Sequence, residues 1–357
     1  MTGVLSAFII LLLLGVLITV HELGHFLAAR LCGIRVREFA IGMGPAFYKK
    51  QKTDENGEPA GTKFSLRALP IGGFCDLGED EASDDPAHFR NKRLWQKIFV
   101  LISGALMNFL LGFVFYLILF GVLGYRDVPV VSWTDPSFPY QQIQAGDRFV
   151  AINGNRVSST RDSRLFLSLD ADEPYTFELE RDGVPYTVAG VTRQLTNSAG
   201  EKIFGFQVGA YEEIGALGVI GTAAGETFSS VRMVWVSLGM LISGEAKVTD
   251  MAGPVGMGGM VNGILSQEGA TLGVTALNIL DLAGMVAVNL AVFNLLPIPA
   301  LDGGRILFLF ISAFLVLVRK KPLSEKVEGY IHGGTMLLLF GLMIFIFFND
   351  IRRLIGL

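Results

Sequence analysis

The sequence is poor in cysteine and in charge. Only Cys32 and Cys75 occur among 357 residues, and neither belongs to a CxxC pair. Two thiols are too few for a disulfide framework, so we interpret both as ordinary thiols. Charged residues make up 17% of the chain, and the formal net charge is -4. The basic residues also lack interleaved aromatics, so nothing indicates a nucleic-acid partner.

The features of a cleavable signal sequence are also scarce in the first apolar run. The N-terminus has no basic region before its first apolar run, and no small-residue cleavage site follows that run, so we expect the run to stay on the mature protein. Apolar residues, in contrast, are abundant, at 51% with a mean hydropathy of +0.50. They are concentrated in blocks, which is typical of a multi-pass membrane protein.

A metal-binding motif lies in the first apolar block. His21 and His25 are four positions apart, which on a helix places them about 40° apart around the axis and one turn apart along it. Both imidazoles can therefore reach one metal ion, and Glu22 between them is placed to take a proton from a metal-bound water. Ionisable groups in so apolar a segment are costly and usually functional. We predict that His21 and His25 bind zinc and that Glu22 is the catalytic base.

The first membrane segment, residues 1–34, is followed by a polar stretch at 35–97. Alternating residues and turn signals predict a small β element in this stretch. Twelve Lys and Arg residues lie between Arg30 and Lys97, and the positive-inside rule therefore makes the loop cytoplasmic and the N-terminus external. Residues 98–124 form the second predicted membrane segment.

A soluble composition marks residues 125–211. Within it, Gln144 to Gly154 forms an alternating strand that closes on an Asn-Gly turn. This string resembles the core strand of PDZ domains, which bind extended peptides by strand addition, and any other small β domain is the alternative. Residues 212–281 are predicted to form an amphipathic or interfacial helical region, although 214–243 is also compatible with a full span.

The third predicted membrane segment covers residues 282–318. A cytoplasmic loop at 319–330 and a fourth segment with the C-terminus at 331–357 complete the chain. The third segment contains Pro297 and Pro299, which break the helix and free backbone groups that a cavity or neighbouring helices must satisfy. Membrane proteins tolerate such a break where a site is built.

Asp302 follows this break and is the predicted third zinc ligand. Counting residues from the outer face places it at a depth similar to that of the two histidines. A buried carboxylate there is expensive unless a cation accompanies it, and two histidines with one carboxylate form a recognised hydrolytic zinc set. Asn289 and Asn294 are predicted to bind the backbone of a substrate strand, with interhelical hydrogen bonding as the alternative.

Together, these motifs resemble the site-2 protease family of intramembrane zinc metalloproteases. HExxH in a first membrane segment, a PDZ-like insert and NxxPxPxLDG in a later segment carry the resemblance, which is greatest to the bacterial regulator of sigma-E protease branch. It covers nearly the whole chain, including Leu69 to Phe74 and Phe348 to Leu354. Two features depart from the family pattern: the PDZ-like unit is single, and Ser103 to Asn108 replaces the usual GPxxN.

The resemblance implies a fold, a site and a function. The fold is a polytopic α-helical membrane protein of about four transmembrane segments, with a small membrane-associated β element and an inserted PDZ-like β/α domain. His21, His25 and Asp302 would bind Zn²⁺, Glu22 would be the general base, and the substrate channel would be lined by Asn294, Pro297 and Pro299.

The implied enzyme is a zinc metalloendopeptidase of the bacterial inner membrane. Its substrates would be single-span, membrane-anchored regulators such as anti-sigma factors, or signal-peptide remnants. The PDZ-like domain would lie on the extracytoplasmic side, where it contacts substrate or a peptide tail, and the active site would lie near the cytoplasmic face.

Two other functions fit parts of the sequence. A catalytically silent membrane scaffold would bind peptide tails through the PDZ-like domain, but it would have no need of Glu22. A metal transporter would use His21, His25 and Asp302 as a transit site, but it would need polar residues along both halves of a path, and only one end of the predicted bundle has them.

Overall fold

A computed structural model describes residues 2–53, 59–78, 84–169, 173–197, 200–244, 246–251, 253–321 and 323–354. The chain divides into two compact units. One combines Met1–Phe115 with Val234–Leu357, and the other is Tyr116–Met233. The first unit contains most of the long helices and the residues of the predicted metal site.

Within the described residues, four helical stretches are long and apolar enough to cross a membrane. They are α1 (Thr2–Leu31), α2 (Leu94–Leu123), α6 (Leu272–Asn294) and the stretch Lys326–Arg353 of α8 (Glu325–Leu354). Four such helices together with sheet-rich regions agree with the predicted membrane protein carrying β structure. Helix α1 ends at a glycine in the left-handed conformation: Gly33 adopts a φ of 62°, and the N–H of Ile34 donates to the carbonyl of Ala29 at 2.8 Å.

The predicted third membrane segment at 282–318 comprises two helices, and they are separated at the predicted proline break. Helix α6 begins at Leu272, where the Thr271 side chain accepts a hydrogen bond from the N–H of Val274 at 3.3 Å. It ends at Asn294, and α7 (Asp302–Arg319) starts after a non-helical loop. Helix α6 therefore starts before the predicted boundary at residue 282. Likewise, α8 begins at Glu325 rather than at residue 331.

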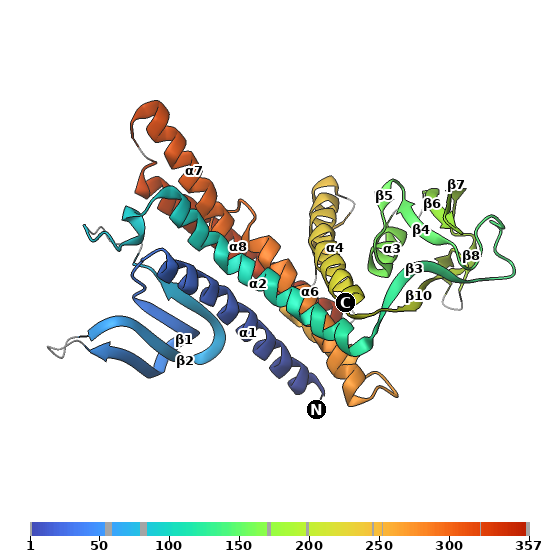
Figure 1. Cartoon of the computed structure of the whole chain (residues 1–357), viewed down its shortest axis with the longest axis horizontal. Coiled ribbons are helices and arrows are strands. Elements are labelled where there is room, and N and C mark those ends of the chain that lie inside the picture. The colour runs from blue at the N-terminus through green and yellow to red at the C-terminus, as the bar shows by residue number, and fades with distance from the viewer. Residues whose placement is uncertain are drawn as a thin grey trace. The chain divides into compact units, whose positions relative to one another are not determined.

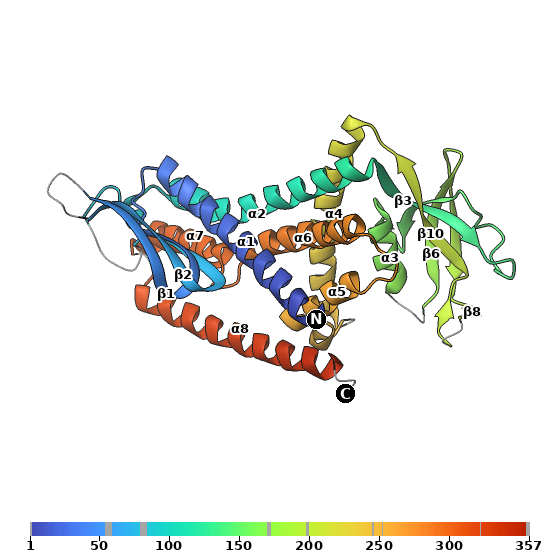
Figure 2. The same cartoon turned by 90° about the horizontal axis from the view of Figure 1, so that it is seen from below.

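The β element consists of two long, bent strands, β1 (Glu38–Thr53) and β2 (Pro59–Asp76). The first part of β1 pairs with β2 twice: Phe39 lies opposite both Phe64 and Cys75. The early residues of β1 therefore lie between two parts of β2, and the stretch from Gly73 to Asp76 lies at one edge of the described sheet. Figures 1 and 2 both show this sheet beside α1.

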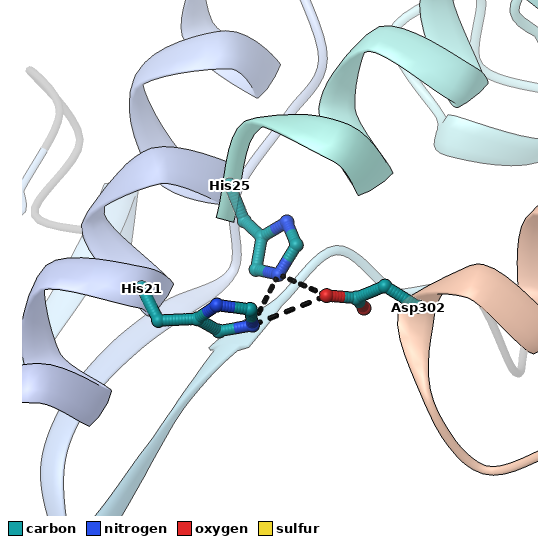
Figure 3. A group of neighbouring side chains, drawn as sticks. All are labelled: His21, His25 and Asp302. Atoms are coloured by element: carbon teal, nitrogen blue, oxygen red, sulfur yellow. Dashed lines mark hydrogen bonds and ion pairs between the residues drawn. The ribbon is translucent and has the colours of Figure 1, made fainter. Parts of the chain in front are cut away.

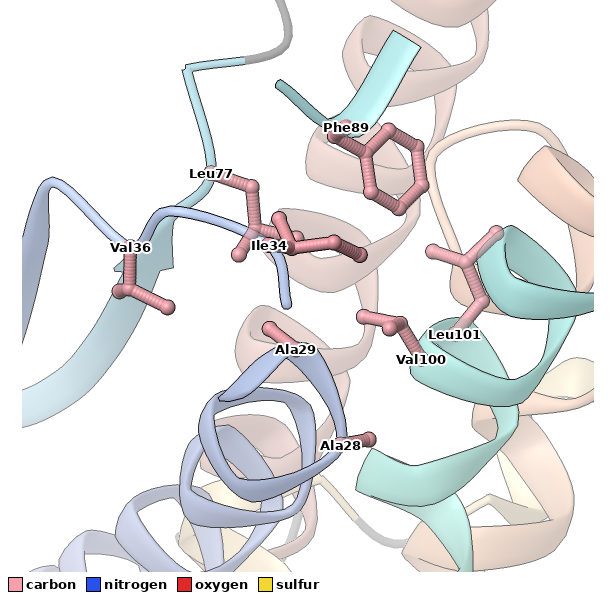
Figure 4. Packing of buried hydrophobic residues seen from close by; sticks show 8 residues of the cluster. All are labelled: Ala28, Ala29, Ile34, Val36, Leu77, Phe89, Val100 and Leu101. Carbon is pink, nitrogen blue, oxygen red and sulfur yellow. The ribbon is translucent and has the colours of Figure 1, made fainter. Parts of the chain in front are cut away.

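A buried apolar cluster joins the end of α1 to the start of α2 (Figure 4). The 3-10 helix η1 (Phe89–Asn91) and the end of the sheet also contribute to it. Its buried members are Ala28, Ala29, Ile34, Val36, Leu77, Phe89, Val100 and Leu101. Because the cluster lies one turn from His25, it fixes the distance between α1 and α2 at the metal motif.

A second cluster brings α1 against two other helices. It contains Ile10 of α1, Val261 of α5 (Pro254–Leu265) and Leu282 of α6. The short helix η2 (Val248–Asp250) precedes α5. The predicted amphipathic region 212–281 thus contains α4 (Ala216–Ser243), η2, α5 and the first residues of α6.

The second unit is built on a sheet of order β10-β3-β4-β6-β7, with β5 paired to β4. Its turn at Asn153 and Gly154 has positive φ at both residues, 49° and 77°, as an Asn-Gly hairpin requires. Phe149, Tyr175 and Phe177 are fully buried in its core. The elements are β3 (Tyr125–Thr134), β4 (Arg148–Ile152), β5 (Asn155–Arg156), α3 (Thr160–Ser168), β6 (Tyr175–Arg181), β7 (Val184–Val191), β10 (Phe206–Glu213) and a separate pair, β8 (Leu195–Thr196) with β9 (Lys202–Ile203).

Helix α4 is not among the four candidate spans of the described chain. Two of the polar residues that interrupt it, Ser229 and Arg232, contact α3 within the second unit. Ser229 donates to the fully buried Asp162 at 2.6 Å, and Arg232 forms an ion pair with the same carboxylate. These contacts explain why an otherwise apolar helix carries a serine and an arginine.

Candidate metal centre and active site

Three potential ligand atoms meet between α1 and α7 (Figure 3). The Nε2 atoms of His21 and His25 are 3.1 Å apart, and they lie 3.1 and 3.3 Å from Oδ2 of Asp302. In tetrahedral zinc sites, bonds of about 2.0–2.1 Å place ligand atoms roughly 3.3 Å from one another. The three atoms therefore have the spacing of a zinc site with one further position open.

The chemistry of these donors also fits a cation. His21 and His25 are each 8% exposed, and no hydrogen bond of good geometry reaches Oδ2 of Asp302 from a described residue. A buried carboxylate oxygen that faces two imidazole nitrogens needs a positive charge among them, because neither solvent nor a donor offsets its desolvation. The predicted third ligand is thus brought to the two histidines across 277 residues of sequence, from position 25 to position 302.

The imidazole of His25 is oriented for metal binding through its other nitrogen. Nδ1–H of His25 donates to the backbone carbonyl of Val100 at 2.8 Å, which leaves the Nε2 lone pair free to bind a metal. The amide of Asn294 lies 3.4 Å from Nδ1 of His21. Asn294, on α6, therefore approaches the metal motif on α1, which is the contact between helices that the sequence offered as the alternative to substrate binding.

Two glycines make room for the histidines, and sequence reasoning missed both. A Cβ on Gly104 of α2 would overlap Nε2 of His25 and come within 2.8 Å of Cε1 of His21. A Cβ on Gly24 of α1 would overlap the backbone of Ser103. Small residues on facing helices are typical of close helix packing in membranes. A glycine in each of two predicted membrane segments was therefore the sequence pattern that could have indicated this contact.

The predicted base, Glu22, lies next to the edge of the β sheet. A Cβ built on Gly73 of β2 would be 3.7 Å from Cγ of Glu22, so the Glu22 side chain lies against this strand. Glu22 is half-buried. The position suits a group that must reach both a water at the metal and a peptide held nearby.

The remaining predicted residues lie on α6 and in the loop between α6 and α7. Pro297 and Pro299 belong to the loop, where Pro297 is exposed and Pro299 is half-buried, and Asn289 is a half-buried residue of α6. Gly303 and Gly304, at the start of α7, pack so tightly on this loop that a Cβ would overlap the carbonyls of Leu295, Leu296 and Ile298. Only glycine at these two positions lets Asp302 begin a helix directly against the loop.

Comparison with known families agrees with this geometry. Residues 9–342 match Peptidase family M50. The chain belongs to peptidase family M50, the site-2 protease family. It is 36% identical to a zinc metalloprotease, so named, of Clostridium perfringens over 345 residues, covering 96% of this chain and 97% of the relative.

Other relatives of this M50 peptidase carry similar names. The zinc metalloprotease RasP of Geobacillus kaustophilus is 29% identical, with 95% of this chain and 96% of the relative covered, and RasP of Bacillus licheniformis is also 29% identical, over 96% and 98%. The family and these names identify the chain as a zinc metalloprotease. Its four candidate spans make it a multi-pass membrane protein.

Proposed function

We propose that this M50 peptidase cleaves peptide bonds within the membrane. Its substrates would be transmembrane segments of membrane-anchored regulatory proteins, such as anti-sigma factors, or signal-peptide remnants. The observation that carries the proposal is the convergence of His21, His25 and Asp302 within a candidate membrane-spanning helix and the helix beside it, with Glu22 adjacent.

The residues divide the work of hydrolysis. His21, His25 and Asp302 would hold zinc, which when bound supplies Lewis-acid chemistry by polarising the scissile carbonyl and acidifying water. Glu22 takes the proton of the attacking water and passes it to the leaving amine. The carbonyl of Val100 accepts a hydrogen bond from Nδ1–H of His25 and so keeps the Nε2 lone pair of that imidazole available to the metal.

A substrate helix hides its amides in internal hydrogen bonds, so it must unwind before attack. The edge stretch from Gly73 to Asp76 lies beside Glu22 and offers backbone donors and acceptors to an unwound strand. Pro297 and Pro299, in the loop before Asp302, and Asn289 and Asn294, on the helix before it, would bind the substrate from the other side. The 3.4 Å approach of Asn294 to His21 supports a place for this end of α6 beside the centre.

The proposed setting is the bacterial inner membrane. The basic first loop and the later run Arg319 to Lys321 favour a cytoplasmic location for both, which puts the active site near the cytoplasmic face. The sheet of the second unit would be a PDZ-like domain on the extracytoplasmic side, where it contacts the substrate or a peptide tail.

The test compares wild-type protein with Glu22→Gln on a single-span model substrate in proteoliposomes. The amide keeps the size of the side chain but cannot accept the proton, so we expect turnover to fall by about 10²–10⁴-fold with zinc content unchanged. The variant should still capture uncut substrate. Glu213→Gln, which changes an exposed glutamate of β10, is the matched control and should cleave normally.

Two results would overturn the proposal. Cleavage by Glu22→Gln at near the wild-type rate, with zinc bound, would remove Glu22 from the mechanism. Failure of the zinc-loaded wild type to cut any membrane substrate, with peptide-tail binding intact, would favour the scaffold, and zinc transport into vesicles would favour the transporter.

A further inference from the structure

The loop before Asp302 has an unusual backbone conformation. Ala300 adopts a φ of 85°, and it is one of four described non-glycine residues with positive φ, with Asn153, Asp182 and Lys320. The left-handed region costs a residue with a Cβ roughly 1–2 kcal/mol. Alanine, unlike asparagine or aspartate, has no side-chain hydrogen bond that offsets this cost, so neighbouring groups must hold it there.

The group that holds Ala300 comes from a different helix. Its backbone N–H donates to Nδ1 of His332 on α8 at 2.9 Å. The next loop bond, from the N–H of Leu301 to the carbonyl of Ile298 at 3.0 Å, closes the turn directly before Asp302. His332 therefore binds the loop at its strained residue, two positions before the carboxylate that faces the histidines.

His332 is itself fixed in place. Its ring centroid is 5.0 Å from that of Phe308 on α7, and its Nε2 lies 3.8 Å from Oε1 of Glu328 one turn earlier on α8. Because Nδ1 accepts a hydrogen bond, the neutral ring carries its proton on Nε2, toward Glu328. The ring contact with Phe308 and the tautomer with its proton on Nε2 therefore both direct the Nδ1 lone pair of His332 toward the N–H of Ala300.

We propose that His332 is a positioning residue for Asp302, acting through Ala300. Its Nδ1 holds the loop in the left-handed turn from which α7 begins, and this sets where the Asp302 carboxylate meets His21 and His25. The inference rests on the proposed role of Asp302 as a zinc ligand. It gives α8, which contributes no ligand atom to the cluster, a direct part in building the metal centre.

The experiment measures zinc affinity by chelator competition, without substrate, on full-length purified protein. Groups that orient metal ligands typically contribute 10–100-fold in affinity, so we expect His332→Leu to bind zinc about 10–100-fold more weakly. His332→Asn should retain most of the affinity, because its amide oxygen occupies nearly the place of Nδ1. His332→Gln moves that oxygen outward by one methylene and should behave like His332→Leu.

A second substitution separates positioning from packing. Glycine adopts positive φ without the penalty, so adding Ala300→Gly to His332→Leu should recover part of the lost affinity. The visible spectrum of the cobalt-substituted protein should follow the same order, because it reports ligand geometry. Met336→Leu, an exposed position one turn further on α8, is the control for substitution in this helix.

Wild-type zinc affinity in His332→Leu would overturn the inference. Equal weakening in the Leu, Asn and Gln variants, with no recovery from Ala300→Gly, would also overturn it, because only packing would then be involved. Should His332→Leu fail to fold, the comparison of Asn with Gln still decides. A wild type that binds zinc through Asp302 but cuts no substrate would defeat the proposed function and leave this inference standing.

Discussion

Gly104 has no Cβ, and this absence leaves room for the two imidazoles of the candidate metal centre. The imidazoles of His21 and His25 occupy the space that a Cβ at this position would need. Gly24 on the facing helix lets the backbone of Ser103 approach, so α1 and α2 are in close contact at the height of the motif. The positions of the two imidazoles therefore depend on two residues with no functional group.

Gly104→Ala should damage the metal site more than the fold. The added methyl cannot be relieved by the far end of a flexible side chain, because the atoms that it meets belong to the two imidazole rings. We expect zinc content to fall several-fold and proteolysis to fall at least as far, while the protein still inserts and purifies. Gly121→Ala, where the added Cβ meets nothing within 4 Å, should keep wild-type zinc content.

At the scale of elements, a cluster of hydrogen bonds and ion pairs around Glu38 links β1 to β2. Lys63, Ser65 and Arg67 of β2 all donate to the Glu38 carboxylate, at 2.7, 2.6 and 2.7 Å. Burial opposes ionisation of Glu38, but these three bonds outweigh it and lower the pKa of its carboxyl to about 2. The charge thus stabilises the sheet that places Gly73 beside Glu22.

The stability of this sheet should depend on pH. Glu38 has a lower pKa in the folded sheet than its ordinary 4.5, so its contribution is complete above 4.5 and is lost as the pH falls toward about 2. Hydrogen-exchange protection of β1 and β2, corrected for intrinsic rates, should fall over this window. Glu38→Gln should flatten that dependence, whereas Glu178→Gln, exposed on β6, should leave it unchanged. An unaltered profile in Glu38→Gln would refute the assignment.

A second carboxylate, that of the buried Asp350, links α8 to the N-terminus of α5. Oδ2 of Asp350 accepts hydrogen bonds from the N–H groups of Gly253 and Gly256, at 3.0 and 2.8 Å, and the residue is 4% exposed. A carboxylate at a helix N-terminus satisfies free donors and favours the helix dipole. Asp350, in the terminal run that resembles the family, is therefore a cap supplied from another helix.

For the whole molecule, we predict an orientation in the membrane with the first loop in the cytoplasm and the second unit outside. With Cys32 and Cys75 replaced by serine, Lys49→Cys on β1 should resist an impermeant reagent added outside intact cells, and Val184→Cys on β7 should react. Both positions are exposed, so burial does not confound the comparison. Permeabilised cells should label both. Reaction at 49 with protection at 184 would reverse the proposed topology and the extracytoplasmic place of the second unit.

The sequence alone was sufficient for the chemistry and the class of this protein. Helical periodicity places His21, Glu22 and His25 on one face, and the apolar blocks predict membrane helices, because both signals are local. Asp302 could be predicted as well, since a carboxylate after a double-proline break in an apolar segment has few explanations other than a cation. The match to peptidase family M50 confirmed the class of enzyme, and the ligand role of Asp302 stays a prediction.

Only the tertiary structure decided what surrounds these residues. The start of α6 at Leu272, the room left by Gly104, the approach of Asn294 to His21 and the bond from Ala300 to His332 all depend on contacts between distant segments. No local pattern encodes such contacts, because packing between helices selects which glycine, amide or histidine meets the site.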